Sequence, residues 1–361
     1  MGVLVRTLTD GGQTPQAIAE QLAAFVEPAR KRLDIALYDM RLHDQAAEVV
    51  KGALLSAAAR GVAVRLAYNV DHDRPIAVPP PPRTDPDLIA QLGVPSKPIP
   101  GSPDLMHHKY MVRDGQAVWS GSSNWTDDSW SREENVIATA QSDALAQAFE
   151  LDFEQLWRSQ RVAGSGDVEP RPIQVGASTV RAWFCPEHGT ELAHRIAAAI
   201  GHARRLVRIA SPVITSGPIL GTLAEVAADG KVDVAGVVDA TQIEEVYGQW
   251  AQRERSRWKL TSLAQIFRYA PFTGKRSTPY RPGSVHDYMH AKVTIADDVA
   301  FVGSFNLSHA GELNAENVLE IRDAELCERL GAFIDEVRGL YAAAPLPALK
   351  GMGAMGNLSR E

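Results

Sequence analysis

The chain has 361 residues, of which 45% are hydrophobic, so it is longer than one typical domain and can bury more than one core. Its formal net charge of −7 argues against a surface that attracts nucleic acid as a whole, because non-specific affinity comes mainly from neutralising phosphates. The two cysteines, Cys185 and Cys327, exclude a disulfide framework and favour a reducing compartment.

The sequence also predicts a soluble, cytoplasmic protein. Residues 1–12 lack the basic start and long apolar run of a signal peptide. No stretch approaches the roughly 18 apolar residues that a membrane-spanning helix needs. Contact with a membrane is therefore expected to be peripheral at most.

Apolar periodicity predicts helices and strands that alternate in the same order in both halves of the chain. The first half is expected to contain a helix over 15–32, a strand over 33–38, a helix over 45–60, a strand over 62–68 and a helix over 144–158. The second half is expected to contain a helix over 192–203, a strand over 206–210, a helix over 219–228, a strand over 232–238 and a helix over 325–341. This alternation predicts an α/β protein of two similar lobes, each a mixed sheet flanked by helices.

Composition sets the expected boundaries of the lobes. The first lobe is expected over 1–160 and the second over 179–345. Residues 161–178 are rich in Gly, Pro and charge and are predicted to be the linker, while 346–361 are predicted to be a flexible tail. Residues 79–82 are all proline and predict an exposed, polyproline-like loop.

One pattern of polar residues occurs twice. The first copy consists of His107, Lys109, Asp114, Gly121, Ser122, Asn124 and Glu134. The second consists of His290, Lys292, Asp297, Gly303, Ser304, Asn306 and Glu316. In both copies the Asp follows the Lys by five residues, the Asn follows the Gly by three, and the Glu follows the Asn by ten. A repeat of this kind predicts two half-sites that meet in one composite site.

Each His-x-Lys precedes a short apolar run and is predicted to lie on a buried strand. Side chains alternate along a strand, so His107 and Lys109 face one way and His108 faces the other, where it is expected to pack. Cleavage of a phosphodiester needs a nucleophile, an acid for the leaving oxygen and fixed donors for the other oxygens. Two His, two Lys and two Asn supply these groups.

The remaining motif residues are assigned supporting roles. Glu134 and Glu316 are predicted to orient the histidines, as the third member of a nucleophile–base–orienter chain. Asp114 and Asp297 are expected to hold the lysines or the local backbone. The residues on the Gly-containing turns are expected to approach phosphate closely; they are Ser122, Asn124, Ser304 and Asn306.

With both motifs intact, the sequence resembles the phospholipase D superfamily, whose hallmark is H-x-K-x4-D followed by G-S/G-x-N. The resemblance covers about 30–160 and 200–340. It implies two lobes related by a pseudo-two-fold axis, with the active site between them. It also implies a phosphodiesterase or phosphatidyltransferase that works through a covalent phosphohistidine without a cofactor or metal, with His107 as nucleophile and His290 as general acid/base. A chain that carries both motifs need not dimerise, so a monomer is expected.

The segment from Trp250 to Arg281 contains eight basic residues and one acidic residue, interleaved with aromatic residues. The segment is expected to contact an anionic substrate, which could be a lipid surface or a single strand of nucleic acid. The alternative is that it forms a solvated helix and a long loop. Trp119, Trp125 and Trp130 surround the first motif and are candidates for a pocket mouth or for core positions. The basic residues are Arg253, Arg255, Arg257, Lys259, Arg268, Lys275, Arg276 and Arg281.

Three functions remain open on the sequence. Phospholipid headgroup hydrolysis or transfer is favoured, because the chain is acidic overall. A metal-independent endonuclease on single-stranded DNA or RNA is the alternative, because the first motif is similar to the nuclease and mitochondrial-type branch of the superfamily, whereas secreted phospholipases D tend to have Gly-Gly in place of Gly-Ser. A module that only binds phosphate is the third. Three carboxylate groups are candidate metal ligands by residue type, although loop carboxylates are favoured: Asp71-His72-Asp73, Asp127-Asp128 and Asp297-Asp298.

Overall fold

The structure is a computed structural model that describes residues 2–70, 85–281, 283–343 and 346. The predicted proline-rich loop at 79–82, the Asp71-His72-Asp73 cluster and all but the first residue of the predicted tail lie outside the described residues.

The first lobe alternates strands and helices as the sequence predicts. Its elements are β1 (Leu4–Leu8), α1 (Pro15–Val26), β2 (Arg32–Leu37), β3 (Met40–Arg41), α2 (Asp44–Ala59), β4 (Ala63–Val70), α3 (Pro86–Gln91), β5 (Ser96–Pro100), β6 (Lys109–Arg113), β7 (Ala117–Gly121), β8 (Trp125–Thr126), α4 (Asp127–Ser131), β9 (Asn135–Gln141) and α5 (Asp143–Ser159).

The second lobe follows the same plan with additional helices. Its elements are β10 (Ile173–Val175), β11 (Ser178–Phe184), α6 (Gly189–His202), β12 (Leu206–Ala210), α7 (Gly217–Asp229), β13 (Asp233–Asp239), α8 (Ala240–Ala251), the 3-10 helix η1 (Glu254–Ser256), α9 (Arg257–Tyr269), β14 (Phe272–Lys275), β15 (Val293–Ala296), β16 (Val299–Gly303), α10 (His309–Leu313), β17 (Asn317–Arg322) and α11 (Ala324–Leu340).

The two large sheets repeat one another strand for strand. The first sheet has the order β1-β9-β7-β6-β2-β4-β5, and the second has β10-β11-β17-β16-β15-β12-β13-β14. From β11 onward the second order reproduces the first. In each sheet the last three strands are parallel, and the strand that carries the motif lysine, or directly follows it, pairs antiparallel with its neighbours. The prediction of two similar α/β lobes with mixed sheets is confirmed.

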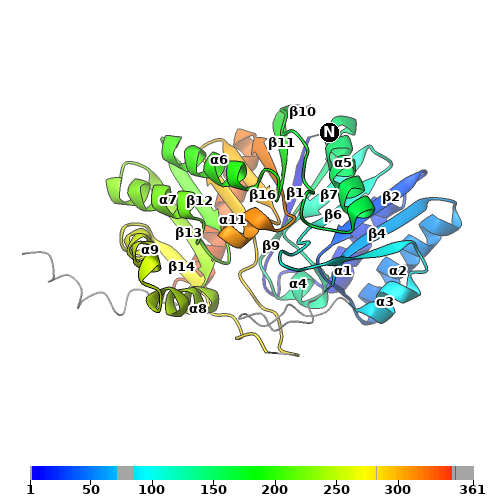
Figure 1. The fold of residues 1–361 in the computed structure, drawn as a ribbon, viewed down its shortest axis with the longest axis horizontal. Coiled ribbons are helices and arrows are strands. Elements are labelled where there is room, and N and C mark those ends of the chain that lie inside the picture. Colours follow the sequence, from blue (N-terminus) through cyan, green and yellow to red (C-terminus); the bar gives the residue numbers. More distant parts are fainter. Residues whose placement is uncertain (1, 71–84, 282, 344–345, 347–361) are drawn as a thin grey trace, which may run out of the picture.

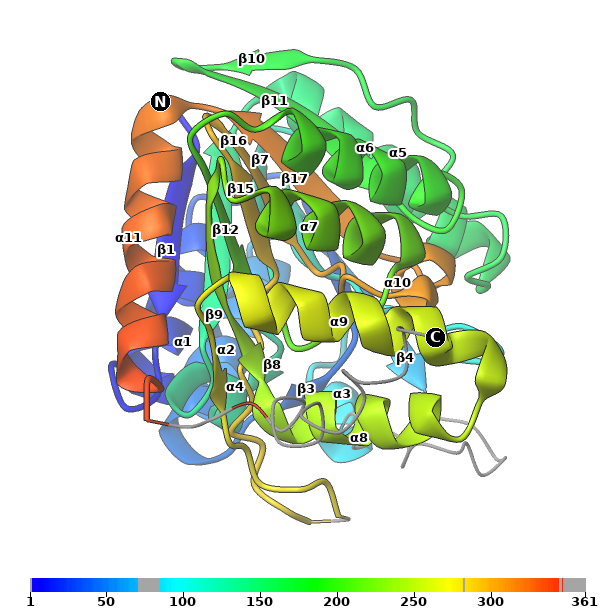
Figure 2. The ribbon, with the colours of Figure 1, turned by 90° about the vertical axis from the view of Figure 1, so that its left-hand side faces the viewer.

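The lobes lie side by side around a shared hydrophobic core (Figure 1). Helices α5 and α11 pack in this core together with strands of both sheets, and the rings of Phe149 and Phe184, one from each lobe, lie 5.0 Å apart. The outer face of the first sheet is covered by α1 and α2, and that of the second by α6, α7 and α9. Figure 2 shows α11 and the pair α6 and α7 on opposite faces of the second sheet.

Two sequence expectations change in the structure, and one alternative is decided. The first helix ends at Val26 rather than at residue 32, because Pro28 cannot continue a helix and restricts the residue before it. The predicted linker contains strand β10, which pairs with β11. Trp119, Trp125 and Trp130 belong to the outer core of the first lobe and do not form a pocket mouth; each is at most 6% exposed.

Candidate active site

The two motif histidines are held at the boundary between the lobes. His107 precedes β6 and His290 precedes β15. The main-chain N–H of His107 donates to the Ala315 carbonyl at 2.9 Å, and that of His290 donates to the Glu134 carbonyl at 3.2 Å. Each histidine is therefore fixed by the backbone of the opposite lobe, and the two half-sites come together as the repeat predicts.

Two further side chains fix the segments that lead into the histidines. Asn69, in β4, accepts a hydrogen bond from the main-chain N–H of Met106 at 3.0 Å. Asp239, at the end of β13, accepts one from the main-chain N–H of Met289 at 3.1 Å. Sequence reasoning missed both residues, although each lies in the corresponding strand of its lobe, two strands before the motif strand.

His107 hydrogen bonds to a carboxylate of the other lobe. Its Nδ1 lies 2.9 Å from Glu316 Oε2, and both side chains are buried. The ring also packs against Tyr38, with the ring centroids 4.5 Å apart. Because Nδ1 is engaged, Nε2 is the nitrogen left free to act on a ligand. Glu316 thus occupies the orienting position that the sequence predicts for it.

His290 has a different environment. Its Nδ1 lies 3.1 Å from Asn135 Oδ1, with which it hydrogen bonds, and 3.4 Å from Glu133 Oε2. Asn135 belongs to the repeated Glu-Asn pair of the motif, but the sequence predicted a role for neither Asn135 nor Glu133. Both come from the first lobe, so the contact again crosses the boundary between the lobes.

Glu134 does not orient His290, and the prediction that it does is wrong. Its carboxylate accepts hydrogen bonds from Lys275 at 3.1 Å and from the Tyr341 hydroxyl at 2.6 Å. Side chains alternate along an extended segment, so Glu133 and Asn135 face His290 while Glu134 faces away. Glu134 therefore joins three distant parts of the chain, and its contribution to the site is made by its main-chain carbonyl.

The two motif lysines lie buried beside the histidines. Lys109 Nζ donates to the His107 carbonyl at 2.6 Å, and Lys292 Nζ donates to the His290 carbonyl at 2.5 Å. Burial lowers the pKa of Lys109 to about 7 and also lowers the pKa of Lys292, which is further depressed by the charge of Lys109. A bound phosphate would favour the charged form of both lysines, because a nearby anion stabilises a cation.

Asp114 and Asp297 lie outside the site and hold the local backbone. Asp114 accepts from three successive main-chain N–H groups, those of residues 30, 31 and 32, at 2.7–2.9 Å. Asp297 does the same for residues 204, 205 and 206 at 2.8–3.0 Å. Burial alone would raise the pKa of each carboxyl, but these donors hold it below its ordinary value. Of the two roles the sequence left open for these residues, the backbone role is the one observed.

The Gly-containing turns place asparagine, rather than serine, toward the site. Asn124 and Asn306 line the cavity between the lobes, and the buried Oδ1 of each has no hydrogen-bond partner among the described residues. Ser122 and Ser304 are fully buried behind them. Their hydroxyls accept from the main-chain N–H of Val136 and Asn317, respectively, so they hold each turn against the next strand and do not face the cavity.

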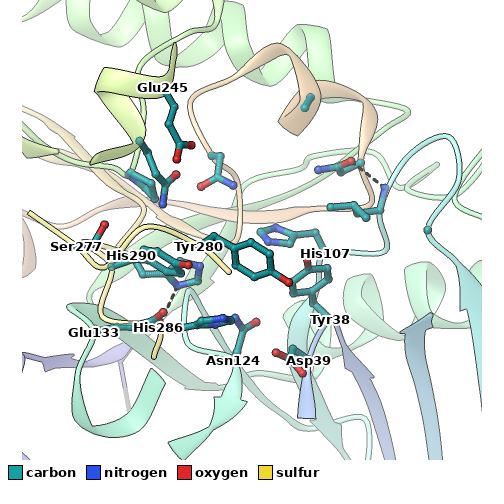
Figure 3. Close-up of a pocket in the computed structure, with 18 of the residues that line it drawn as sticks. Tyr38, Asp39, His107, Asn124, Glu133, Glu245, Ser277, Tyr280, His286 and His290 are labelled. Atoms are coloured by element: carbon teal, nitrogen blue, oxygen red, sulfur yellow. Dashed lines mark hydrogen bonds and ion pairs between the residues drawn. The ribbon is translucent and has the colours of Figure 1, made fainter. Parts of the chain in front are cut away.

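A cavity of about 490 Å³ opens between the lobes over both histidines. Figure 3 shows His107, His290, Asn124 and Glu133 gathered around it, and a dashed line joins Glu133 to His290. Among the described residues that line it there is no lysine or arginine. The other lining side chains are mainly acidic, hydroxyl-bearing or aromatic, and include Tyr38, Asp39, Asp104, Thr241, Glu245, Ser277, Tyr280, His286 and Tyr288.

Several other candidates lie apart from this cavity. His108 is fully buried, and its Nδ1 lies 3.2 Å from Asn317 Oδ1, which fits the packed position predicted for it. Asp127 pairs with His43, and Asp128 pairs with Arg132. Within the described residues, no group of three or more His, Cys, Asp or Glu is arranged to hold a metal ion, and no helix is long and apolar enough to cross a membrane.

Comparison with known families agrees with this geometry. A family model described as "Cardiolipin synthase, PLD-like domain" matches residues 22–157 and 196–337, and each matched segment contains one copy of the motif. The chain belongs to the phospholipase D superfamily.

Individual proteins match this chain in sequence over a short stretch and in structure over most of its length. A mitochondrial cardiolipin hydrolase of Xenopus laevis is 40% identical over 57 residues, which are 16% of this chain and 27% of that protein. The chain therefore covers only about a quarter of the length of this curated relative.

Two solved structures share the fold. The phosphatidylserine synthase of Haemophilus influenzae Rd KW20 matches with a TM-score of 0.61 at 14% identity, over 92% of this chain and 85% of that one. The polyphosphate kinase of Porphyromonas gingivalis matches with a TM-score of 0.56 at 12% identity, over 93% of this chain and 47% of that one. At these identities the likeness shows a common two-lobed architecture.

Two carboxylates of this phospholipase D superfamily site, Glu316 and Glu133, have raised pKa values. Burial raises the pKa of Glu316 to about 7, against an ordinary value of 4.5, although nearby Lys109 opposes the shift. Burial raises the pKa of Glu133 to about 7 as well, against hydrogen bonds from Ser129 and Asn135. The folded protein therefore holds protons in this site at pH values where the unfolded chain has released them.

This shift predicts a pH-dependent cost of Glu316 to stability. Between about pH 4.5 and 7 the folded state keeps a proton that the unfolded state loses, so the stability that this proton provides at low pH disappears as the pH rises through 7. Glu316→Gln removes that loss. We expect the variant to gain stability relative to the natural protein between pH 5 and pH 8, measured as free energies of unfolding in urea. The exposed Glu325→Gln is the control, and a Glu316→Gln difference that is the same at both pH values would contradict the assignment.

Proposed function

We propose that this phospholipase D superfamily member cleaves or transfers a phospholipid headgroup through a covalent phosphohistidine on His107. The observation that carries the proposal is the pair of histidines from opposite lobes on one cavity, each with Nδ1 engaged by a partner from the other lobe. That arrangement leaves the Nε2 atom of each histidine available, so one can attack a phosphorus from one side while the other protonates the leaving oxygen on the opposite side. His107 is assigned as nucleophile because its Nδ1 contacts a carboxylate directly.

In the first step, Nε2 of His107 attacks phosphorus as the bond from phosphorus to the leaving oxygen breaks. His290 donates its Nε2 proton to that oxygen, and the alcohol departs neutral. The phosphorylated ring of His107 keeps its Nδ1 proton and is a cation. Glu316, at 2.9 Å, stabilises that charge, as the carboxylate of a catalytic triad stabilises an imidazolium.

In the second step, neutral His290 takes a proton from water or from an acceptor alcohol. The resulting oxygen nucleophile attacks phosphorus, and the bond between phosphorus and His107 Nε2 breaks. Water gives hydrolysis and an alcohol gives transfer. The two asparagines, which line the cavity, supply hydrogen bonds to the phosphoryl oxygens through both steps, and the two lysines, buried beside the histidines, supply positive charge.

The lining of the cavity supports a phospholipid headgroup over a nucleic-acid strand. A strand brings several phosphates, which nucleic-acid-binding proteins meet with Lys and Arg. The described lining carries no lysine or arginine and includes the carboxylates of Asp39, Asp104, Glu133 and Glu245. One phosphodiester with neutral or cationic neighbours fits this lining better than a polyanion does.

The basic and aromatic segment does not form one continuous groove. Lys275 is buried against Glu134, and Arg276 pairs with Glu244. Trp250 and Phe267 are core residues. This dispersal weakens the main support for the endonuclease alternative, which stays as an outcome of the assay below.

An exposed part of the segment fits a membrane surface. At η1 and the start of α9, Arg253, Arg255 and Arg257 are exposed around Trp258, which is 48% exposed. We name these four residues the α9 surface. Each arginine near an anionic bilayer contributes about 1 kcal/mol to membrane binding, and tryptophan is enriched at the level of the lipid headgroups. We propose that the α9 surface contacts anionic lipid headgroups peripherally.

The proposed chemistry predicts headgroup release that depends on both histidines. With purified protein in EDTA, we expect alcohol release from phosphatidylcholine or phosphatidylglycerol vesicles, and little cleavage of single-stranded DNA or RNA run in parallel. His107→Ala and His290→Ala should each lower the rate at least about 10²-fold, because each removes a nucleophilic or acid–base group.

The exposed His202→Ala is the matched control and should retain the natural rate. Strand cleavage without headgroup release would make the protein a nuclease. Binding of inorganic phosphate without turnover of any substrate would make it a binding module. Near-natural turnover in either histidine variant would overturn the composite site.

The α9 surface predicts a salt-dependent contact with anionic vesicles. Reversing the charge of Arg253, Arg255 and Arg257 to Glu should weaken sedimentation with phosphatidylglycerol vesicles by more than about tenfold, since each arginine adds about 1 kcal/mol. Cleavage of a soluble chromogenic phosphodiester should not change.

Three charge reversals elsewhere provide the control, at the exposed residues Arg158, Lys231 and Arg322. Equal loss of vesicle binding in the two triple variants would show only an effect of net charge and would overturn the assignment of the α9 surface.

A further inference from the structure

The two lobes place their acidic and amide side chains in exchanged positions. Strand pairing fixes the comparison, because Gly121 pairs with Ile137 in the first lobe and Gly303 pairs with Val318 in the second. Counting back from these pairs, Asn135 corresponds to Glu316. Two residues earlier, on the same face, Glu133 corresponds to Asn314. The first lobe thus reads Glu-x-Asn where the second reads Asn-x-Glu.

The main chain confirms this register independently. His290 bonds through its N–H to the Glu134 carbonyl, and His107 bonds to the Ala315 carbonyl, so Glu134 corresponds to Ala315. Helices α4 and α10 begin three residues after their motif asparagines and have the same length, but Arg132 adds one residue after α4. The equal spacing from Asn to Glu in the two copies is therefore a coincidence of sequence.

The orientation of the Asn135 amide is fixed by its neighbours. Its Nδ2 donates to the Ser129 carbonyl at 3.2 Å, the Ser129 hydroxyl at 3.1 Å and Glu133 Oε2 at 3.0 Å. Since these three groups offer acceptors, Oδ1 must point the other way. There it accepts from the Ser122 hydroxyl at 2.7 Å and lies 3.1 Å from His290 Nδ1.

We infer that Asn135 is the direct positioning residue of His290, and that Glu133 acts on His290 mainly by orienting Asn135. Resting on the proposed function, this inference deepens it by giving the two histidines different supports. The Glu316 carboxylate contacts His107 directly. The Asn135 amide oxygen contacts His290, and the nearby Glu133 carboxylate lies farther from that ring, at 3.4 Å.

The difference suits the two roles. An amide oxygen only accepts a hydrogen bond, so it holds His290 in the tautomer that carries a proton on Nδ1 and leaves Nε2 to exchange its own. It brings no full charge, so it does not trap His290 as a cation the way a carboxylate in direct contact would. The phosphorylated ring of His107, by contrast, stays cationic until the second step and has the carboxylate in contact.

Single variants in the two lobes test which side chain is the direct partner. In the first lobe we expect Asn135→Ala to lower kcat on a soluble chromogenic phosphodiester by about 10- to 100-fold, and Glu133→Gln to lower it less. In the second lobe the order should reverse, with Glu316→Gln worse than Asn314→Ala. If Glu133→Gln lowers kcat at least as much as Asn135→Ala does, the inference is overturned.

An exchange that preserves side-chain size tests the role of charge. Asn135→Asp alone sets a second carboxylate against Glu133, so we expect most activity to be lost. Adding Glu133→Gln restores an amide-to-carboxylate hydrogen bond with the roles reversed, and E133Q/N135D should exceed N135D in kcat by at least about tenfold. The comparison of N135D with E133Q/N135D tests the inference even if circular dichroism shows that Asn135→Ala does not fold.

The pH profile separates positioning from simple structural support. In E133Q/N135D a carboxylate contacts His290 directly and raises its pKa, so the basic limb of kcat/KM should move to higher pH. An unmoved limb, or no recovery over N135D, would overturn the inference. The proposed function is judged separately, because it fails only if the natural protein shows no turnover that His107→Ala and His290→Ala abolish.

Discussion

The hydrogen bond between His107 Nδ1 and Glu316 crosses from one lobe to the other, and the organisation of the site follows from such crossings. His290 likewise takes its partners from the first lobe, and the backbone of each histidine is bonded to a carbonyl of the opposite lobe. Neither lobe has a complete site by itself. The shared hydrophobic core around α5 and α11 holds the two lobes in contact and so maintains the hydrogen bonds that cross between them.

Burial at the boundary between the lobes disfavours the charged forms of the carboxylates and lysines of the site. Glu133, Glu316 and Lys109 all have pKa values near 7, because the boundary between the lobes removes them from water. A phosphodiester that enters the cavity brings a negative charge close to the two buried lysines, and this charge favours their protonated, cationic form. The site is therefore most strongly charged when its ligand is bound, which is where electrostatic stabilisation of a phosphoryl group is needed.

The sequence predicted the architecture and most of the reacting groups, because both depend on local pattern. Apolar periodicity located the helices and strands, and the duplicated motif located His107, His290 and the two lysines. The orienting carboxylate of the first lobe was misplaced, since Arg132 adds one residue after α4 and spacing alone cannot reveal which side chain then faces His290. Ser122 and Ser304 were misassigned for a similar reason, because only the pairing of the next strand shows that they face inward.

The proposed mechanism requires that His107 carry the phosphoryl group between the two steps. The direct test is to quench turnover of a diester labelled in its phosphoryl group within milliseconds, and to map the protein-bound label by mass spectrometry. Covalent catalysis by His107 should give an acid-labile, base-stable phosphohistidine on the peptide that contains His107, formed and lost at rates compatible with turnover. Label on His290 instead, or no labelled protein at any time during turnover, would contradict it.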